Sequence, residues 1–433
     1  MRQVYSADWV LPVEGAPIED GAVAVEDGRV AAVGPAAEVG AGERFEAAAI
    51  LPGLVNAHSH LEYAVYAGFG DGLAFAPWIA LHIERKARIG LEEMVAIARL
   101  GTAECLRSGF TTTADYSYSG AAALAAGELG LRAVVYLEVF GEDPAAALEH
   151  FERARELVEP ALSDRVAVGV SPHAPYSCSL EVFEACAALG LPIGTHIAES
   201  PAEQEWLVHG RGPMAALAHM YVAPRGETGT RSLARHGLLG PGVLAAHCVH
   251  VDDEEIALLA EHDVAVAHCP RSNALLGCGT APLAELRAAG VRLGLGTDSP
   301  ASTPSFDGFE ELRSAVFAAR ARAESPDALS ADTALELATL GAARALGLDE
   351  EVGSLVAGKR ADLTVVSLDD SPYLPWENAA AAVVFGGSAD RVLLTIVDGI
   401  ERYRKGSEEW HELIAAAHAA RGRLLRSAVV EPA

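Results

Sequence analysis

Short apolar runs rich in β-branched residues alternate with Ala- and Leu-rich stretches through the middle of the chain. Each run has the length of a strand, and each is followed by a helical segment or a long loop. Eight such units in series predict a (β/α)₈ barrel, an α/β fold in which helices surround a closed parallel sheet. The predicted strands are residues 54–60, 110–116, 132–139, 166–173, 193–198, 243–249, 264–269 and 292–298.

The two ends of the chain have a different pattern, with short strands and tight turns. Residues 21–34 place an Asp-Gly pair between two apolar runs, which predicts a β-hairpin. Residues 353–368 and 392–403 have the same short-strand character. Neither end has enough strands to bury a core alone, so we expect the two ends to meet in one small β-sandwich domain.

These patterns divide the chain into three segments. We expect the first part of the β-sandwich in residues 1–51, the barrel in residues 52–355, and the second part of the sandwich in residues 356–433. Residues 407–427 show helical periodicity, and we expect this last helix to pack on the outside of the molecule.

The charge balance limits the partners. The chain has 32 Lys and Arg residues against 60 Asp and Glu residues, a formal net charge of −28. So negative a surface repels phosphate backbones and anionic lipid headgroups. We therefore expect a small-molecule partner, with no nucleic acid and no membrane, and we leave open whether the chain forms a homo-oligomer.

The sequence also bears on the cellular compartment. Its first residues, MRQVYSADWVLPVEG, contain no basic segment followed by an apolar one, and no apolar stretch is long enough to span a bilayer. The six cysteines are scattered, without a C-x-x-C pair, as expected for reduced thiols. These features predict a globular cytoplasmic protein.

Metal-capable residues fall at the ends of the predicted strands. His58 and His60 end the first, His196 the fifth and His247 the sixth, while Asp298 ends the eighth. Any one of them alone would be read as a core or surface residue, and Asp298 as a turn aspartate. Strand ends converge in a barrel, however, and imidazoles with a carboxylate suit Zn²⁺ or another first-row divalent ion.

Six stretches carry a resemblance to a known family. They are LPGLVNAHSH, SPHAPYSCS, THIAES, AAHCVH, HCPRSN and GTDSPAS. Through them the chain resembles the amidohydrolase superfamily, in particular the branch of aminohydrolases that deaminate purines, pyrimidines, triazines and 5′-modified adenosines. The resemblance covers nearly the whole chain, and the flanking β segments match the split sandwich of that family.

The resemblance implies a metal site with one ion per chain. It makes His58, His60, His196 and Asp298 the ligands of Zn²⁺, with Fe²⁺ or Mn²⁺ as alternatives. Relatives with two metals use a carboxylated lysine on the fourth strand. Here that strand ends in His173 and contains no lysine, so the resemblance favours a mononuclear site.

The resemblance also implies a reaction. Glu199, His247 and Asp298 become the catalytic residues: the last two orient the attacking water and accept its proton. Hydroxide attacks the ring carbon that bears the amino group, while Glu199 protonates the adjacent ring nitrogen and then the departing amine. Ammonia leaves, and a carbonyl remains on the ring.

The segment 61–86 contains an unusual number of aromatic residues. They form either a stacking wall for a flat heteroaromatic ring or a packed lid, and the sequence favours neither alternative. The aromatic residues in question are Tyr63, Tyr66, Phe69, Phe75 and Trp78.

Five residues are candidates for substrate binding. In relatives that act on adenosine derivatives, a Trp and a Glu of this loop contact the base and the ribose. Trp78 matches the first, and either Glu62 or Glu84 could match the second. We expect His173 to face the ring. Arg271 either reaches an anionic tail of the substrate or pairs with a nearby acid.

Within the branch, H-S-H-L-E-Y together with CPRSN most resembles the aminodeoxyfutalosine deaminases of menaquinone biosynthesis. Deaminases of 5′-deoxyadenosine, methylthioadenosine or S-adenosylhomocysteine are close alternatives. More distant ones are guanine, pyrimidine or triazine aminohydrolases, and hydrolases of a cyclic amide or a chloro-heterocycle. The cytidine-deaminase zinc signature is excluded, because its P-C-x-x-C half is absent.

Overall fold

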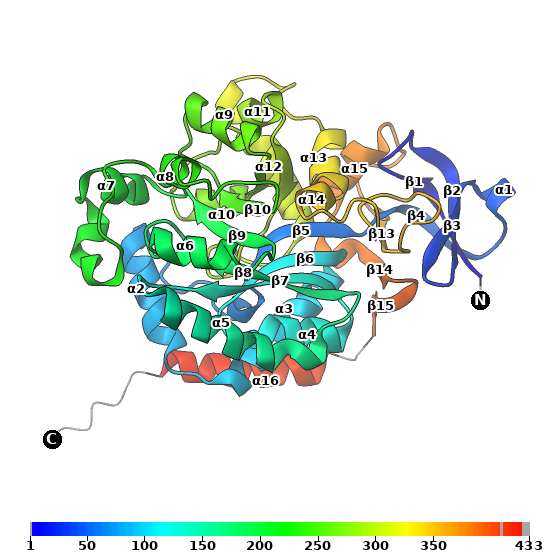
Figure 1. The fold of residues 1–433 in the computed structure, drawn as a ribbon. Coiled ribbons are helices and arrows are strands. Elements are labelled where there is room, and N and C mark those ends of the chain that lie inside the picture. The colour runs from blue at the N-terminus through cyan, green and yellow to red at the C-terminus, as the bar shows by residue number, and fades with distance from the viewer. Residues whose placement is uncertain (1, 408–409, 427–433) are drawn as a thin grey trace.

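A closed parallel barrel forms the centre of the molecule in the computed structural model, which describes residues 2–407 and 410–426 (Figure 1). Its strands occur in chain order, and each pairs in parallel with its neighbour. All eight predicted strands are confirmed. They are β5 (Leu54–Ser59), β6 (Phe110–Ser117), β7 (Arg132–Val139), β8 (Val166–Pro172), β9 (Ile193–Ile197), β10 (Val243–His247), β11 (Ala265–His268) and β12 (Arg292–Leu295).

The first and last barrel strands meet where the end of β5 contacts the residues that follow β12. Ser59 and Asp298 form a parallel bridge, and the amide of Asp298 donates a hydrogen bond of 2.9 Å to the carbonyl of His58. The barrel therefore closes at its C-terminal rim, where the active sites of such barrels lie.

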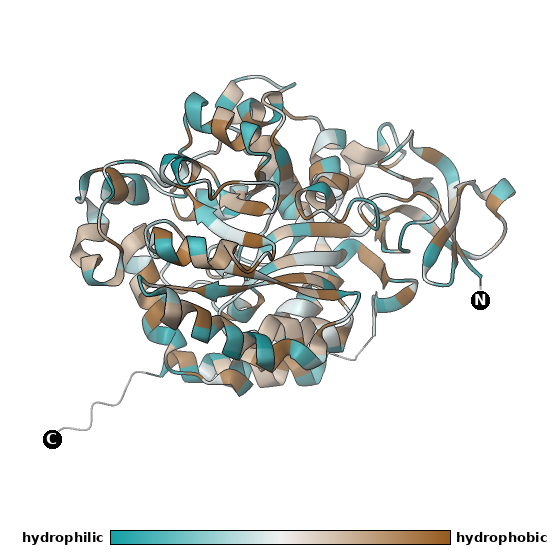
Figure 2. Ribbon diagram, viewed as in Figure 1, coloured by the Kyte–Doolittle hydropathy of each residue, from teal (hydrophilic) through white to brown (hydrophobic). Residues whose placement is uncertain are grey.

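Helices cover the barrel, and α5 shows how such a helix buries one face against a strand. In α5 the buried residues are Ala147, Phe151, Ala154 and Val158, spaced three or four apart. Accordingly, the outer helices carry both hydrophilic and hydrophobic residues (Figure 2). The helices are α2 (Phe75–Lys86), α3 (Leu91–Arg107), α4 (Ala121–Leu129), α5 (Pro144–Val158), α6 (Leu180–Ala187), α7 (Pro201–His209), α8 (Gly229–Arg235), α9 (Asp253–Glu261), α10 (Pro270–Leu275), α11 (Leu283–Ala288), α12 (Gly308–Ala323), α13 (Ala331–Leu337) and α14 (Leu340–Ala345).

Both ends of the chain contribute to a second, mixed sheet beside the barrel, which confirms that they form one unit. Its strand order is β15-β14-β13-β4-β1-β2-β3, so the N- and C-terminal halves join where β4 pairs with β13. Its strands are β1 (Gln3–Val10), β2 (Ile18–Glu26), β3 (Arg29–Pro35), β4 (Glu43–Pro52), β13 (Leu363–Ser367), β14 (Val392–Val397) and β15 (Ile400–Arg404). The short helix α1 (Ala36–Val39) packs on β2 and β3, whereas α15 (Ala379–Gly386) packs on α12 and α13.

The predicted hairpin and the last helix are also present. Asp27 and Gly28 join β2 to β3, both with the positive φ that a tight two-residue hairpin turn requires. The predicted helix at residues 407–427 is α16 (His411–Leu425), which packs on the outer side of α3 (Figure 1). Residues 408, 409 and 427 lie outside the described part of the chain. Among the described residues, no helix is long and apolar enough to cross a membrane.

A buried ion-pair cluster links the barrel to the second sheet. Arg132, on β7, donates to Asp362 at 3.2 Å and to Asp398 at 2.5 Å. Arg132 is 5% exposed and Asp362 3% exposed. Breaking such a pair from one side leaves the other charge buried without compensation, which costs more than the pair contributes.

We predict that Arg132→Met lowers the free energy of unfolding by about 3–5 kcal/mol, because Asp362 loses its buried partner. The matched control is Arg153→Met, whose partner Glu149 and own side chain are both about two-thirds exposed; it should cost less than about 1 kcal/mol. Chemical denaturation of both variants measures the difference. Equal losses would mean that the buried cluster does not join the two parts.

Candidate metal and active site

The rim of the barrel brings the five metal-capable residues predicted from the sequence into one cluster. His58 lies in β5 and His60 directly follows it, His196 lies in β9 and His247 in β10, and Asp298 follows β12. His247 and Asp298 have positive φ values of 74° and 57°, which non-glycine residues rarely adopt. Such backbone strain concentrates at functional sites.

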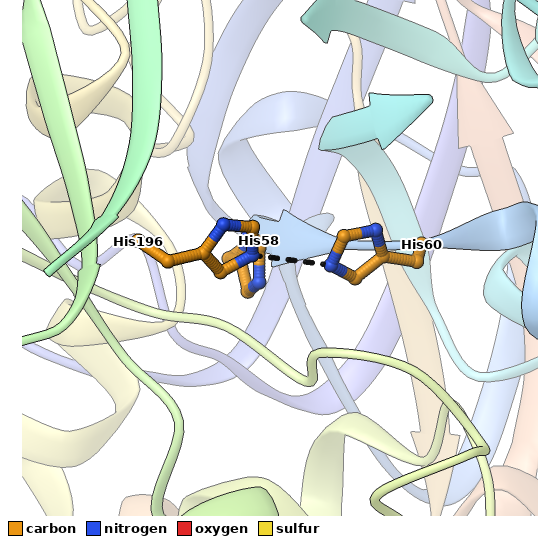
Figure 3. A group of neighbouring side chains, drawn as sticks. All are labelled: His58, His60 and His196. Atoms are coloured by element: carbon orange, nitrogen blue, oxygen red, sulfur yellow. Dashed lines mark hydrogen bonds between the residues drawn. The ribbon is translucent and has the colours of Figure 1, made fainter. Parts of the chain in front are cut away.

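The side chains of the cluster lie within a few ångströms of one another. Nε2 of His60 and Nε2 of His196 are 3.4 Å apart, with the ring of His58 beside them (Figure 3). Oδ1 of Asp298 lies 3.7 Å from Nε2 of His58 and 3.6 Å from Nε2 of His60. Ligand-capable atoms of His58, His60 and His196 fall within 4.8 Å of one another, as do those of His58, His247 and Asp298.

Burial keeps these imidazoles neutral. It lowers the pKa of His60 and of His196 to about 4, and it lowers the pKa of His58 and His247 well below the usual value, an effect that the neighbouring histidines reinforce. A neutral imidazole keeps a lone pair available for a metal. The cluster therefore offers several uncharged nitrogen donors and one carboxylate at neutral pH.

The surroundings of the His58 ring show whether a cation fits this cluster. It is fully buried, and neither of its ring nitrogens has a hydrogen-bond partner in the described part of the chain. A buried polar group without a partner is costly, and native structures rarely keep one without a reason. A metal ion between His58, the other histidines and Asp298 would satisfy it, so the donor set fits a divalent cation.

Hydrogen bonds from behind the cluster orient its donors. Nδ1 of His60 contacts the carbonyl of Tyr116 at 2.8 Å, and Nδ1 of His196 contacts the carbonyl of His173 at 2.8 Å, so each ring turns Nε2 inward. The hydroxyls of Ser272 and Ser302 donate to Oδ2 of Asp298, at 2.6 and 2.8 Å. Oδ1 is thereby left facing the histidines.

The sequence interpretation missed the residues behind the cluster. Ser272 and Asn273 lie in the HCPRSN stretch, and Ser302 follows GTDSPA, but no role was assigned to them. The side-chain amide of Asn273 contacts Nδ1 of His247 at 3.0 Å. Because these three residues lie close in sequence to His268 or Asp298, their position could have indicated that they support the cluster.

Glu199 and His247 lie together at the floor of a cavity that opens onto the cluster. Oε1 of Glu199 is 3.7 Å from Nε2 of His247, and both side chains are buried. Burial raises the pKa of Glu199 well above its usual value, and the charges of Asp298 and Glu203 add to the effect. The cavity lining also includes Trp78 and His173, two of the predicted substrate-binding residues.

The aromatic residues of segment 61–86 divide between the two proposed roles. Tyr63, Phe75 and Trp78 line the cavity, as a stacking wall would. Tyr66 and Phe69 are buried beneath it, where the guanidinium of Arg85 lies 3.8 Å from the centre of the Phe69 ring. One side of the segment therefore forms a wall of the cavity, and its other side packs into the protein core.

Neither of the two acidic candidates in this loop lines the cavity, which corrects both alternatives. Glu62 is buried against the N-terminus of α4, where it accepts hydrogen bonds from the hydroxyls of Ser117 and Ser119. Glu84 points to solvent and pairs with Arg88. The Glu62 carboxylate therefore holds the start of α4 in place, and the Glu84 carboxylate lies outside the cavity.

Arg271 pairs with acids and does not line the cavity, so only the second of its two predicted roles holds. Its Nε donates to Glu311 and its Nη1 to Glu310, both at 2.5 Å. Arg271 is 8% exposed, and a third hydrogen bond goes to the carbonyl of Ser305. With these donors engaged inside the protein, the guanidinium is not offered to a substrate.

Two charged residues that the sequence interpretation overlooked do line the cavity: Lys86 and Glu138. Glu138 lies near the end of β7 and is 3% exposed. Burial raises its pKa to about 8. A carboxylate near the end of an otherwise apolar strand run, RAVVYLEV, was the signal that could have revealed it.

Comparisons with known proteins agree with this architecture. A 5-methylthioadenosine/S-adenosylhomocysteine deaminase of Moorella thermoacetica is 36% identical over 90% of this chain and 91% of its own. A 5′-deoxyadenosine deaminase of Methanothermobacter thermautotrophicus is 34% identical over 90% of this chain and 91% of its own. The solved structure of an adenosine deaminase from Xanthomonas campestris with bound zinc superposes with a TM-score of 0.84 at 31% identity, covering 98% of both chains.

Residues 49–401 match the amidohydrolase family as a continuous segment that includes the entire barrel and, from the second sheet, β13, β14 and parts of β4 and β15. The predicted cluster residues, Glu199 and the cavity all fall within the matched segment. With the fold, the identity to its relatives and this match in agreement, the chain belongs to the amidohydrolase family.

Proposed function

We propose that the protein is a metal-dependent hydrolytic deaminase of a 5′-modified adenosine. The observation that carries the proposal is the position of the Glu199 carboxyl, 3.7 Å from His247, at the floor of a cavity shared with the His–Asp cluster. The deaminase names of the two relatives above support the reaction, and their substrates support the modified adenosine.

Four residues would hold the metal: His58, His60, His196 and Asp298. We propose one Zn²⁺ per chain, with Fe²⁺ or Mn²⁺ as alternatives, because β8 ends near His173 and contains no lysine to bridge a second ion. When bound, such an ion lowers the pKa of a coordinated water toward neutrality and so supplies a nucleophile.

The chain's own residues would then move the protons. His247 is neutral because burial lowers its pKa, and it can accept a hydrogen bond from the attacking water. The carboxylate of Asp298, oriented by Ser272 and Ser302, can take the proton of that water. Glu199, whose pKa is raised by burial, can give its proton to the ring nitrogen. The proton that Asp298 took from the water would then pass to the departing amine, and Glu199 would recover a proton from the hydroxyl that becomes the ring carbonyl.

The cavity walls suit a flat ring. Phe75 and Trp78 on α2 supply apolar surface for stacking, and His173 on the other side offers a ring nitrogen. The substrates that we propose differ in their 5′ substituent. They are aminodeoxyfutalosine, methylthioadenosine, S-adenosylhomocysteine and 5′-deoxyadenosine.

A screen for ammonia release tests the proposal. The metal-loaded protein is incubated with these four nucleosides, with adenosine, and with guanine, cytosine and an aminotriazine as controls. We expect a 5′-modified adenosine to have the highest kcat/KM, because the cavity joins the ring site to further aromatic surface. A preference for a free base would refute the substrate class, and chloride release from a chlorotriazine without ammonia release would refute the reaction.

Replacing Glu199 separates its role from that of the metal ligands. We predict that Glu199→Gln lowers kcat by on the order of 10²- to 10⁴-fold, because the amide keeps the shape but has no proton to shuttle. Its metal content should equal that of the wild type, whereas His196→Ala should lose metal and activity together. More than about a tenth of wild-type turnover in Glu199→Gln would exclude the assigned role. Loss of its metal would make Glu199 a ligand.

A further inference from the structure

Glu138 and Lys86 stand out in the cavity because neither forms a hydrogen bond or an ion pair with any described residue. In the described part of the chain the Glu138 carboxylate accepts no hydrogen bond, and its Oε1 is completely enclosed. Lys86, at the end of α2, likewise forms no hydrogen bond and no ion pair within the described ranges. The two charges also do not pair with each other, since no N···O distance between them falls within 4.0 Å.

Aromatic rings hold the Lys86 ammonium at the cavity wall. It lies 3.8 Å from the centre of the Tyr118 ring, 5.8 Å from that of Phe140 and 5.9 Å from that of Tyr63. Cation–π contacts of this kind fix a charge without using its N–H donors. Lys86 therefore keeps N–H donors that face away from the rings and remain available to a ligand in the cavity.

The chemistry of the two side chains restricts what lies between them. A carboxylate that pairs with Lys86 would be repelled by Glu138 whenever Glu138 is ionised, and an ammonium group that pairs with Glu138 would be repelled by Lys86. A pair of hydroxyls satisfies both, because each hydroxyl can donate to the carboxylate and accept from the ammonium. A vicinal diol therefore fits this pair better than a group of either charge.

The location of Glu138 then identifies which part of the substrate it meets. Ligand-capable atoms of Glu138, His173 and His196 lie within 4.8 Å of one another, so the carboxylate is next to the metal cluster. A group held there must be close to the reacting ring, not at the far end of a 5′ substituent. In an adenosine derivative the sugar is the part that carries hydroxyls so near the base.

We propose that Glu138 and Lys86 together recognise the 2′,3′-diol of the substrate's ribose and make that diol a requirement of the site. Glu138 accepts hydrogen bonds from the hydroxyls, and Lys86 donates to them. The assignment rests on the proposed function. It gives the sugar contact to β7 and the end of α2, in place of Glu62 and Glu84, which do not line the cavity.

The test compares nucleosides that differ only at the sugar. We expect the wild-type protein to deaminate 5′-deoxyadenosine with a kcat/KM on the order of 10²-fold or more above that of 2′,5′-dideoxyadenosine or 3′,5′-dideoxyadenosine, because buried polar groups reject an analogue that leaves them unpaired. Glu138→Leu should bring that ratio close to one. Lys86→Met keeps the aliphatic stem among the rings and should lower the ratio in the same direction.

The matched control is Glu84→Gln, which alters a carboxylate on the same helix as Lys86 but outside the cavity, and its ratio should equal that of the wild type. Binding of 5′-deoxyinosine against 2′,5′-dideoxyinosine measures the diol preference without turnover. If the protein prefers the diol in binding but releases no ammonia, the inference about Glu138 and Lys86 holds and the proposed deaminase function is wrong.

Three results would contradict the inference about Glu138 and Lys86 without contradicting the proposed deaminase function. One is a wild-type ratio near one. Another is an unchanged ratio in Lys86→Met, which also decides the matter if Glu138→Leu does not fold. The third is loss of metal from a folded Glu138→Leu, which would make Glu138 a metal ligand together with His173 and His196.

Discussion

The site depends on the crowding of four neutral imidazoles and one carboxylate at the closed rim of the barrel. Parallel strands that end at the same level bring His58, His60, His196 and His247 together, and the turn after β12 adds Asp298. Burial removes the water that would otherwise solvate them, and it lowers the pKa of each histidine. Such a cluster lacks a partner for His58 until a cation occupies it.

The same contacts that close the barrel also build the site. The backbone hydrogen bond from Asp298 to His58 joins the last strand to the first and sets the carboxylate beside the histidines. Ser272 and Ser302 then orient it, so a change in barrel closure would move a donor of the cluster. The second sheet stabilises this frame through Arg132, which reaches from β7 to Asp362.

The local sequence pattern made the strands and the cluster predictable. The paths of the loops, and the partners that their charged side chains meet, could not be predicted from it. His196 and Asp298 could be placed because the ends of barrel strands converge whatever the loops do. Glu62 and Glu84 could not, since only the course of the chain after β5 decides whether a side chain meets α4, solvent or the cavity. Arg271 was ambiguous for the same reason: its partner Glu311 is 40 residues away. Nor could the sequence show that Glu138 accepts no hydrogen bond from the described residues.

The measurement that tests the central claim most directly is the location of the metal in crystals of the zinc-loaded protein by anomalous scattering at the zinc edge. We expect one zinc peak per chain, surrounded by nitrogen atoms of His58, His60 and His196 and by Oδ1 of Asp298. A peak held instead by Glu138, His173 and His196, or two peaks of similar occupancy in one chain, would contradict it.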